Sequence, residues 1–241
     1  MVLHEKGGFF VETERSVIPR SGRPDLLRPI YDPTPVAGEG FLDPAQAELL
    51  LSSITERISK SEGTQMFNLY SYEFFTYVLL FTGCRLSEGL TLSPSSFKRS
   101  SGVYEVVIPT FKKRDKSKRP ARHVPLYPIL EKMEREYRLA FSLSPHSTRP
   151  YFHFRDRTYQ IFLRQQGALI GLPRIHPHAL RHTFAIWHMV IGYQLDEIRD
   201  FFGHESVRTT EIYLRLGRGL KKLPEWSAHA ERIREMYGLK S

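Results

Sequence analysis

The chain has 241 residues, of which 41% are hydrophobic and 12% aromatic, and its formal net charge is +9. This apolar content is enough to form a core, so the composition excludes a chain that is disordered throughout. The excess of positive charge favours a polyanionic partner, most simply nucleic acid.

The single cysteine and the lack of a long apolar run indicate the kind of compartment in which the protein works. Cys84 excludes an internal disulfide, which fits a reducing compartment, and its apolar neighbours favour a packed structural thiol over a nucleophile. The charged opening MVLHEKGGFFVETER is unlike a signal peptide. The most apolar run, Phe74 to Phe81, is far shorter than the roughly 20 residues of a membrane span. We therefore expect a soluble, cytoplasmic protein with no membrane partner.

Residues 1–40 show no sustained hydrophobic period. They contain five prolines and end in two closely spaced glycines: Pro19, Pro24, Pro29, Pro33, Pro35, Gly38 and Gly40. Frequent prolines and glycines of this kind are typical of loops. We predict an irregular N-terminal arm or linker over residues 1–40 and a folded domain over residues 41–241.

Two helices are expected to begin the folded domain. Asp43 is a suitable N-cap and Pro44 a suitable first helical residue for a helix through AQAELLLSSITERI. A second helix, from about Met66 to Thr82, is apolar on nearly every side, which predicts a central place in the core. Gly83 is expected to end it, and a short helical turn is expected from Arg85 to Leu90.

Two strands are predicted at Val103 to Pro109 and Ala121 to Leu126. The loop between them, FKKRDKSKRP, carries the positive charges of Lys112, Lys113, Arg114, Lys116, Lys118 and Arg119, opposed by Asp115 alone. Two interpretations are open. The loop is a solvated hairpin tip, as most charge runs are, or it is a β-hairpin that lies in a DNA groove or along phosphates.

Helical patterns follow over Tyr127 to Phe141 and from Asp156 to Gly171. A last helix is expected from about Pro224, with Trp226, Ala230, Ile233 and Tyr237 along one stripe. Together these segments predict an α+β fold class, mostly α, with a small β-sheet or hairpin.

The stretch from His176 to Leu216, HPHALRHTFAIWHMVIGYQLDEIRDFFGHESVRTTEIYLRL, concentrates groups that suit attack on a phosphodiester. His178 and Arg181 are three residues apart in a helical pattern, so they share one face. His204 follows at the end of a second helical stretch, and Tyr213 lies one short helix later. An arginine can bond two phosphate oxygens at once, imidazoles can donate hydrogen bonds or move protons, and a phenol can act as a nucleophile.

The pattern as a whole resembles the catalytic domain of the tyrosine recombinase (phage integrase) family, whose signature is Arg, Lys, His-x-x-Arg, His/Trp and Tyr. The matching positions are Arg85, a hairpin lysine, His178, Arg181, His204 and Tyr213, in the contexts TGCRLSE, HALRHTFA, FFGHES and TTEIYLRL. The resemblance extends from about Phe41 to the C-terminus. It implies a tyrosine recombinase-like catalytic domain that cleaves and rejoins DNA in site-specific recombination, such as integration or excision of a mobile element.

The resemblance also assigns roles to these residues. Tyr213 would attack the DNA backbone and form a covalent 3′-phosphotyrosine intermediate. Arg85 and Arg181 would stabilise the negative charge that develops on the phosphate oxygens, because arginine is planar and permanently charged. His178 and His204 would donate hydrogen bonds to the same oxygens or handle protons, and His178 is the candidate base.

In the family the catalytic lysine lies on the hairpin, which favours the DNA-contacting interpretation of that loop. Lys112 directly follows the strand and is our first candidate for protonating the leaving 5′ oxygen; Lys113 is the second. The remaining hairpin cations are expected to contact DNA: Arg114, Lys116, Lys118 and Arg119. Glu88, three residues after Arg85, would orient that arginine or a catalytic base; the alternative is an ordinary surface carboxylate.

His176, His178 and His182 raise the question of a metal site. No Asp, Glu or Cys nearby completes a zinc-binding set, since the one cysteine is remote in sequence. We therefore expect no metal and no other cofactor, and structural roles for His182 and His188.

Double-stranded DNA is the partner that the resemblance implies, with a homotetramer on DNA and a monomer when free. Members of the family usually place a DNA-clamping domain before the catalytic one, and residues 1–40 are too short and proline-rich to form it. Either the chain is a minimal catalytic-domain protein, or the clamp lies on another chain or a further part. The last helix docks on a neighbouring protomer or on its own domain.

Two rival functions remain at this point. A type IB topoisomerase-like enzyme would use similar chemistry to relax supercoils as a monomer. A DNA-binding accessory protein would have lost the catalytic set, although the presence of every signature residue argues against it.

Overall fold

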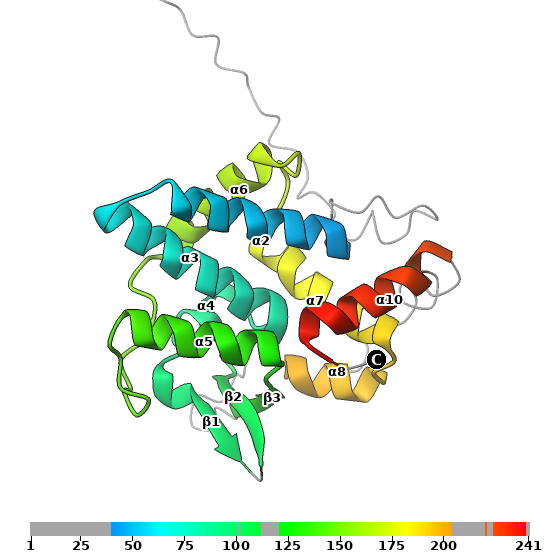
Figure 1. The fold of residues 1–241 in the computed structure, drawn as a ribbon. Coiled ribbons are helices and arrows are strands. Elements are labelled where there is room, and N and C mark those ends of the chain that lie inside the picture. Colours follow the sequence, from blue (N-terminus) through cyan, green and yellow to red (C-terminus); the bar gives the residue numbers. More distant parts are fainter. Residues whose placement is uncertain (1–39, 101, 112–120, 204–219, 221–223, 240–241) are drawn as a thin grey trace, which may run out of the picture.

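The computed structural model describes residues 40–100, 102–111, 121–203, 220 and 224–239. Within these ranges the chain is mostly helical and carries one small antiparallel sheet, as the sequence predicts (Figure 1). The helices are α2 (Pro44–Ser59), α3 (Gly63–Thr82), α4 (Leu86–Gly89), α5 (Pro128–Ala140), α6 (Asp156–Leu169), α7 (Pro177–Ile191), α8 (Leu195–Phe202) and α10 (Pro224–Tyr237). The strands are β1 (Phe97–Ser100), β2 (Val103–Pro109) and β3 (Ala121–Pro125), and β1 is preceded by the 3-10 turn η1 (Pro94–Ser96).

Helix α2 begins where the capping residues predict. The Asp43 carboxylate accepts a hydrogen bond from the backbone N–H of Gln46 at 2.8 Å, and the Gln46 side chain accepts one from the backbone N–H of Asp43 at 3.1 Å. Pro44 stands at the first helical position. Two of the unpaired N–H groups at this helix end are thus satisfied by local contacts.

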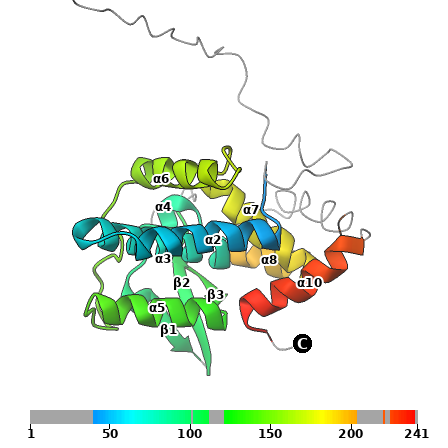
Figure 2. The same ribbon diagram turned by 45° about the horizontal axis from the view of Figure 1, so that its top comes forward.

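Helix α3 is the centre of the domain. It packs against α2, α5 and α7, which explains why its sequence is apolar on nearly every side (Figure 2). Gly83 ends it in the left-handed conformation, with φ of 60°. A Cβ atom at this position would lie 2.6 Å from the rings of both Phe184 and Phe202, so the space also requires glycine. The chain that leaves α3 is thereby held tightly against α7 and α8.

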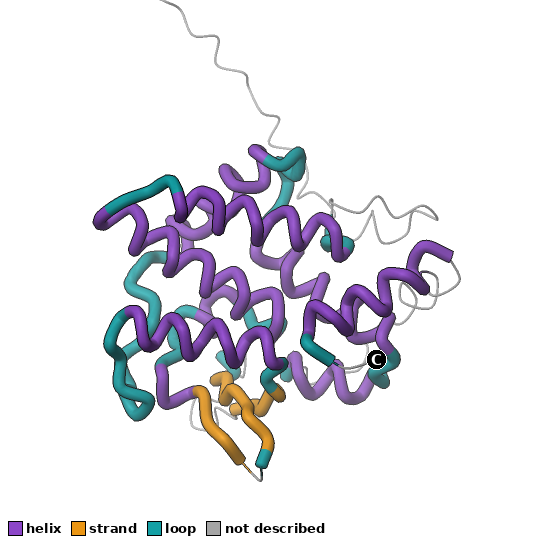
Figure 3. Tube along the Cα trace, viewed as in Figure 1, coloured by secondary structure: helices purple, strands orange, loops and turns teal. Residues whose placement is uncertain are grey.

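The sheet has the strand order β1-β2-β3, and both pairings are antiparallel. Figure 3 shows the three strands together at one edge of an otherwise helical body. The two predicted strands are confirmed, but β1 is a strand that the sequence analysis missed. Its sequence FKRS has one apolar residue, Phe97, which pairs with Val106 of β2. The partner strand, rather than an intrinsic hydrophobic pattern, makes this segment extended.

The C-terminal helix α10 packs on its own domain. Figures 1 and 2 both show it lying alongside α7, and it also contacts α2 and α5. The predicted stripe is confirmed, because Trp226, Ile233 and Tyr237 are buried and Ala230 packs against the core. The Tyr237 ring stacks on Tyr127 with the ring centroids 4.0 Å apart. Of the two alternatives for this helix, the structure therefore shows docking on the same chain.

Every helix in the described part of the chain is too short or too polar to span a lipid bilayer. Cys84 is buried, and burial raises the pKa of its thiol to about 11, as expected for a structural cysteine.

Candidate active site

Arg85 is the N-cap of α4, and Glu88 lies within that short helix. The Glu88 carboxylate is fully buried, so the alternative of a surface carboxylate is wrong. It accepts a hydrogen bond from Nη1 of Arg85 at 2.8 Å and one from the Arg85 backbone N–H at 2.9 Å. The Arg85 side chain is 17% exposed. Glu88 thus holds the guanidinium of Arg85 at the edge of the core, as the prediction that it orients Arg85 requires.

Arg181 lies in the first turns of α7 and is 4% exposed. It donates to the backbone carbonyl of Gly83, two residues before Arg85, and to that of Phe202 at 3.3 Å. Its guanidinium carbon lies 3.9 Å from the centre of the Phe202 ring, a cation–π contact. Arg181 therefore joins α7 to the chain entering α4 and to the C-terminal end of α8.

Arg122 of β3 is a member of this cluster that the sequence analysis did not single out. It is 7% exposed and donates from Nη2 to Oε2 of Glu88 at 2.7 Å. Its Nε donates to the backbone carbonyl of Phe201 at 2.7 Å, and its Nη1 lies 3.3 Å from Oγ1 of Thr110. One signal in the sequence could have identified it. Arg122 lies two residues before Val124 in a predicted strand, so both side chains point to the same, buried face of the sheet.

We call Arg85, Glu88, Arg122 and Arg181 the arginine cluster. Burial acts to raise the pKa of the Glu88 carboxyl, but the hydrogen bond and charge of Arg122, followed by the bonds from Arg85, outweigh it. The pKa of Glu88 therefore lies below its ordinary value of 4.5, and the group is a carboxylate at neutral pH. A buried carboxylate shared by two arginines fixes both side chains.

The histidines at the start of α7 differ in exposure. His178 is exposed, whereas His176 and His182 are half-buried. His176 is the N-cap of α7, because its Nδ1 accepts a hydrogen bond from the backbone N–H of Ala179 at 3.2 Å. Burial, followed by the positive charges of its neighbours, lowers the pKa of His182 to about 3, which keeps that ring neutral. His178, the predicted base, is thus the histidine of this group that solvent or a ligand can reach.

His188 is buried deeper on α7. Its Nδ1 donates to the carbonyl of Phe184 at 2.6 Å, and its Nε2 shares a hydrogen bond of 2.6 Å with the Tyr127 hydroxyl. Burial lowers its pKa to about 3. These contacts support the expected structural role. Within the described residues, no three His, Cys, Asp or Glu side chains gather as a metal site would require.

The remaining predicted site residues lie outside the described residues: Lys112, Lys113, Arg114, Lys116, Lys118, Arg119, His204 and Tyr213. The residues on both sides of the hairpin loop are described, as is Gly203 before His204. Thr110 and Arg122 face each other at the base of the loop, and a Cβ atom on Gly203 would lie 3.1 Å from each of these side chains. The base of the lysine-bearing loop and the residue before His204 are therefore in contact.

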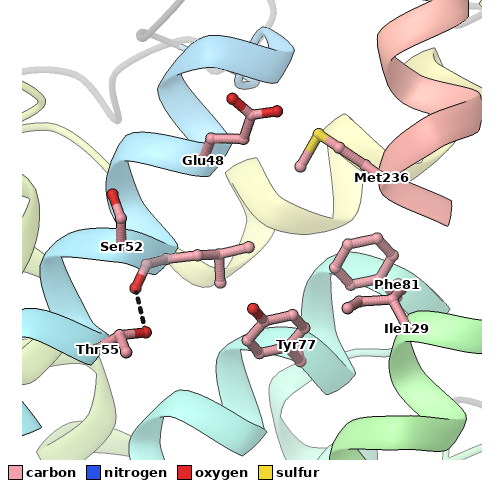
Figure 4. A pocket seen from close by; sticks show the side chains of 8 residues that line it. Glu48, Ser52, Thr55, Tyr77, Phe81, Ile129 and Met236 are labelled. Atoms are coloured by element: carbon pink, nitrogen blue, oxygen red, sulfur yellow. Dashed lines mark hydrogen bonds between the residues drawn. The ribbon is translucent and has the colours of Figure 1, made fainter. Parts of the chain in front are cut away.

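A hollow of about 360 Å³ lies elsewhere, between α2, α3, α5 and α10 (Figure 4). Glu48, Ser52, Thr55 and Tyr77 supply its polar groups. The described residues that line it include no arginine or lysine, so its chemistry is unsuited to a phosphate.

Comparison with known proteins agrees with this arrangement. Tyrosine recombinase XerC of Chlamydia pneumoniae is 29% identical over 196 residues, which make up 77% of this chain and 57% of that protein. A probable integrase/recombinase of Acholeplasma phage L2 is 26% identical over 188 residues, covering 73% of this chain and 60% of that protein. The chain thus spans less than two thirds of the length of these curated relatives.

Solved structures share the fold. The XerH site-specific recombinase in a post-cleavage complex with palindromic difH substrate aligns with a TM-score of 0.58 and 23% identity, over 78% of this chain and 52% of that one. The catalytic domain of bacteriophage HP1 integrase aligns with a TM-score of 0.51 and 20% identity, over 73% of this chain and 87% of that domain. The fold is that of tyrosine recombinase catalytic domains.

The family model described as "Phage integrase family" matches residues 41–218, a range that contains the arginine cluster and every predicted catalytic position. The chain belongs to the phage integrase family of tyrosine recombinases.

Proposed function

We propose that this chain is a site-specific DNA recombinase that cleaves and rejoins DNA strands through a covalent 3′-phosphotyrosine at Tyr213. One observation carries the proposal. Arg181 binds the carbonyl of Gly83, two residues before Arg85, and that of Phe202, two residues before His204. Three positions far apart in sequence therefore lie around one point of the fold, as a single phosphate site needs.

The arginine cluster provides positive charge that is positioned before substrate arrives. Glu88 Oε1 is the one hydrogen-bond partner that the described residues offer the Arg85 guanidinium, whose remaining N–H groups can bind a phosphate oxygen. Donors that are already oriented toward developing charge lower the barrier without reorganising during the reaction. Arg85 and Arg181 would stabilise the transition state in this way.

The proton transfers involve the other members of the signature. His178 is exposed on α7 and would accept the proton of the Tyr213 hydroxyl, whose ordinary pKa near 10 requires a base and a positive field. His204 would donate a hydrogen bond to a phosphate oxygen. Lys112, or else Lys113, would protonate the leaving 5′ oxygen. The phosphotyrosine conserves the energy of the phosphodiester bond, so a strand hydroxyl can reseal it without nucleotide hydrolysis.

Double-stranded DNA is the proposed partner, with assembly into a homotetramer on two recombining duplexes. The titles of two structural relatives describe XerH bound to its difH substrate, before and after cleavage. The +9 net charge of this chain fits a polyanionic ligand. Within the chain we assign residues 41–241 to the catalytic domain and residues 1–40 to an arm or linker.

A suicide substrate tests the proposal directly. A duplex nicked beside the scissile phosphate traps the covalent adduct, because the short cleaved strand diffuses away. We expect an adduct with the native chain and none with Tyr213→Phe, which should bind DNA about as well, since only one hydroxyl is lost. Mapping of the attached peptide should identify Tyr213. An adduct with Tyr213→Phe would show that the nucleophile is another residue.

The products separate the rival activities. Exchange of strands between two duplexes that carry the same site is the result expected of a recombinase. Relaxation of any supercoiled plasmid by a monomer would indicate a topoisomerase-like enzyme instead. DNA binding without any adduct would indicate an accessory protein.

A further inference from the structure

Arg122 connects four parts of the fold through one side chain. Its guanidinium contacts Glu88 of α4, Thr110 after β2 and the carbonyl of Phe201 in α8, while its backbone belongs to β3. We infer that Arg122 is a positioning residue, which holds Arg85 in a fixed place relative to the end of α8 and so sets the geometry of the phosphate site. The inference rests on the function proposed above.

The contacts form a closed chain around the site. Phe201 and Phe202 are the last two residues of α8, and each of their carbonyls accepts a hydrogen bond from a different arginine, Arg122 or Arg181. The carbonyls at a helix C-terminus have no partner within the helix and carry partial negative charge, so cations there are favourable. Arg181 also binds the carbonyl of Gly83, and Arg122 also binds Glu88. Both arginines therefore connect the end of α8 to the neighbourhood of Arg85. Moving the end of α8 relative to Arg85 breaks at least one of these bonds.

Arg122 acts through its neighbours and not on substrate. All three of its guanidinium nitrogens already donate to protein oxygens, those of Phe201, Thr110 and Glu88, so the side chain is committed to the protein and not to a phosphate. Its charge still matters, because without it Arg85 would be the remaining cation beside the buried Glu88 carboxylate among the contacts described. In that case Glu88 would bind Arg85 without the second arginine that now fixes the carboxylate. The Arg85 guanidinium, which we propose binds phosphate, would be less firmly positioned.

The same residue anchors the hairpin loop. Ile108 pairs with Arg122, and Pro109 pairs with Ala121, directly before the loop that carries Lys112 and Lys113. Only a planar fork can meet a carboxylate, a carbonyl and a hydroxyl on three sides at once. A lysine at position 122 would reach one of them, so the substitution Arg122→Lys should be a partial replacement.

The test is single-turnover cleavage of the nicked suicide duplex at saturating protein, with DNA affinity measured separately. We expect the cleavage rate to fall about 100-fold for Arg122→Met and about 10-fold for Arg122→Lys, as a displacement of about 1 Å in a catalytic group can cost that much. DNA affinity should stay within about twofold of the native value, because the guanidinium nitrogens of Arg122 are bound to protein oxygens. Thr110→Val, which removes one weak contact, should lower the rate about threefold, in keeping with a lost neutral hydrogen bond.

Arg138→Met is the matched control. Arg138 also donates to a buried glutamate, Glu134, at 3.3 Å, but both residues lie on α5 away from the arginine cluster. Its loss should lower the melting temperature and leave the cleavage rate of the folded protein unchanged. A general effect of weakened folding would reduce cleavage in both variants alike.

A double-mutant cycle with Glu88→Gln separates positioning from an independent role. If Arg122 acts through Glu88 and Arg85, the double variant should cleave within about twofold of the slower single variant, because both changes break the same connection.

Losses that multiply would overturn the inference, as would native cleavage by folded Arg122→Met. If that variant does not fold, Arg122→Lys and Thr110→Val decide the matter, and native rates in both would count against it. A native chain that forms no adduct at all would remove the proposed function first, and this inference with it.

Discussion

Helix α7 contributes to two buried polar clusters that are built in different ways. The arginine cluster is charged: the Glu88 carboxylate binds Arg85 and Arg122, while Arg122 and Arg181 donate to three backbone carbonyls. The second, which we call the tyrosine–histidine cluster, consists of Tyr127, His188, Tyr193 and Tyr237 and is neutral. The first surrounds the proposed phosphate site, and the second lies beneath α10.

The charged cluster and the neutral cluster are suited to different tasks. Buried charges are costly unless every partner is in place, so the arginine cluster defines one geometry and supplies a positive field. In the tyrosine–histidine cluster, burial lowers the pKa of His188 to about 3 and raises the pKa of Tyr237, so both groups are uncharged at neutral pH. It therefore holds α10 without adding charge near a site that must attract phosphate.

The largest expected effect comes from removing the charge of Arg181, which we propose binds the phosphate. Arg181→Met should reduce adduct formation about 1,000-fold, as expected for a lost donor to developing charge, and leaves the carbonyls of Gly83 and Phe202 without that partner. Single-turnover cleavage measures the loss. Arg234→Met is the control, since Arg234 of α10 also donates to a helix-terminal carbonyl, that of Ile191 at 3.3 Å. Equal losses in the two variants would contradict the distinction between the clusters.

Glu88→Gln should have the next largest effect, on stability. At pH 7 we expect a loss of about 3 kcal/mol in the free energy of unfolding, because two buried arginines lose their shared carboxylate. The folded pKa of Glu88 lies below 4.5, so its contribution is present above that pH and is lost as the pH falls through the folded value. Urea unfolding of both proteins at several pH values should show the gap closing only below about pH 4.5. A gap that persists in acid would argue against an ionised Glu88.

His188→Gln tests the neutral cluster, in a different pH window. In the native protein His188 stays unprotonated down to about pH 3, whereas the unfolded chain binds the proton below about 6.5. Between these pH values the unfolded chain binds a proton at His188 that the native protein does not. The free energy of unfolding therefore decreases as the pH falls, by about 2 kcal/mol at pH 5. Glutamine does not titrate, so the difference between the two proteins should narrow from pH 7 to pH 5. A constant difference would mean that His188 titrates normally.

The smallest effect is expected for Tyr193→Phe. It removes a hydroxyl that lies 3.1 Å from that of Tyr127, at the edge of the neutral cluster. A loss of about 0.5–1 kcal/mol is the usual cost of one such hydrogen bond. Thermal unfolding detects it, and the rate of suicide-substrate cleavage should not change. Slower cleavage here would show that the two clusters are coupled through α7.

The elements that can be predicted from the sequence are those whose signals are local. The Asp43–Gln46 capping pair, Gly83 after α3 and Pro224 at the start of α10 act over a few residues, and each boundary lies where it was predicted. The order of signature residues likewise indicates the family from the sequence. Local capping and a recurring pattern of side chains can both be recognised without knowing what lies across the fold.

The way the site is held together depends on contacts between distant elements and is seen in the folded protein alone. Arg122 is 34 residues from Glu88 and 79 from Phe201, so nothing near it in sequence shows that its charge is buried and shared. Strand β1 and the docking of α10 on its own domain also depend on distant partners. A contact between residues far apart in the chain is defined by the packing of whole elements, and a single sequence does not contain that information in readable form.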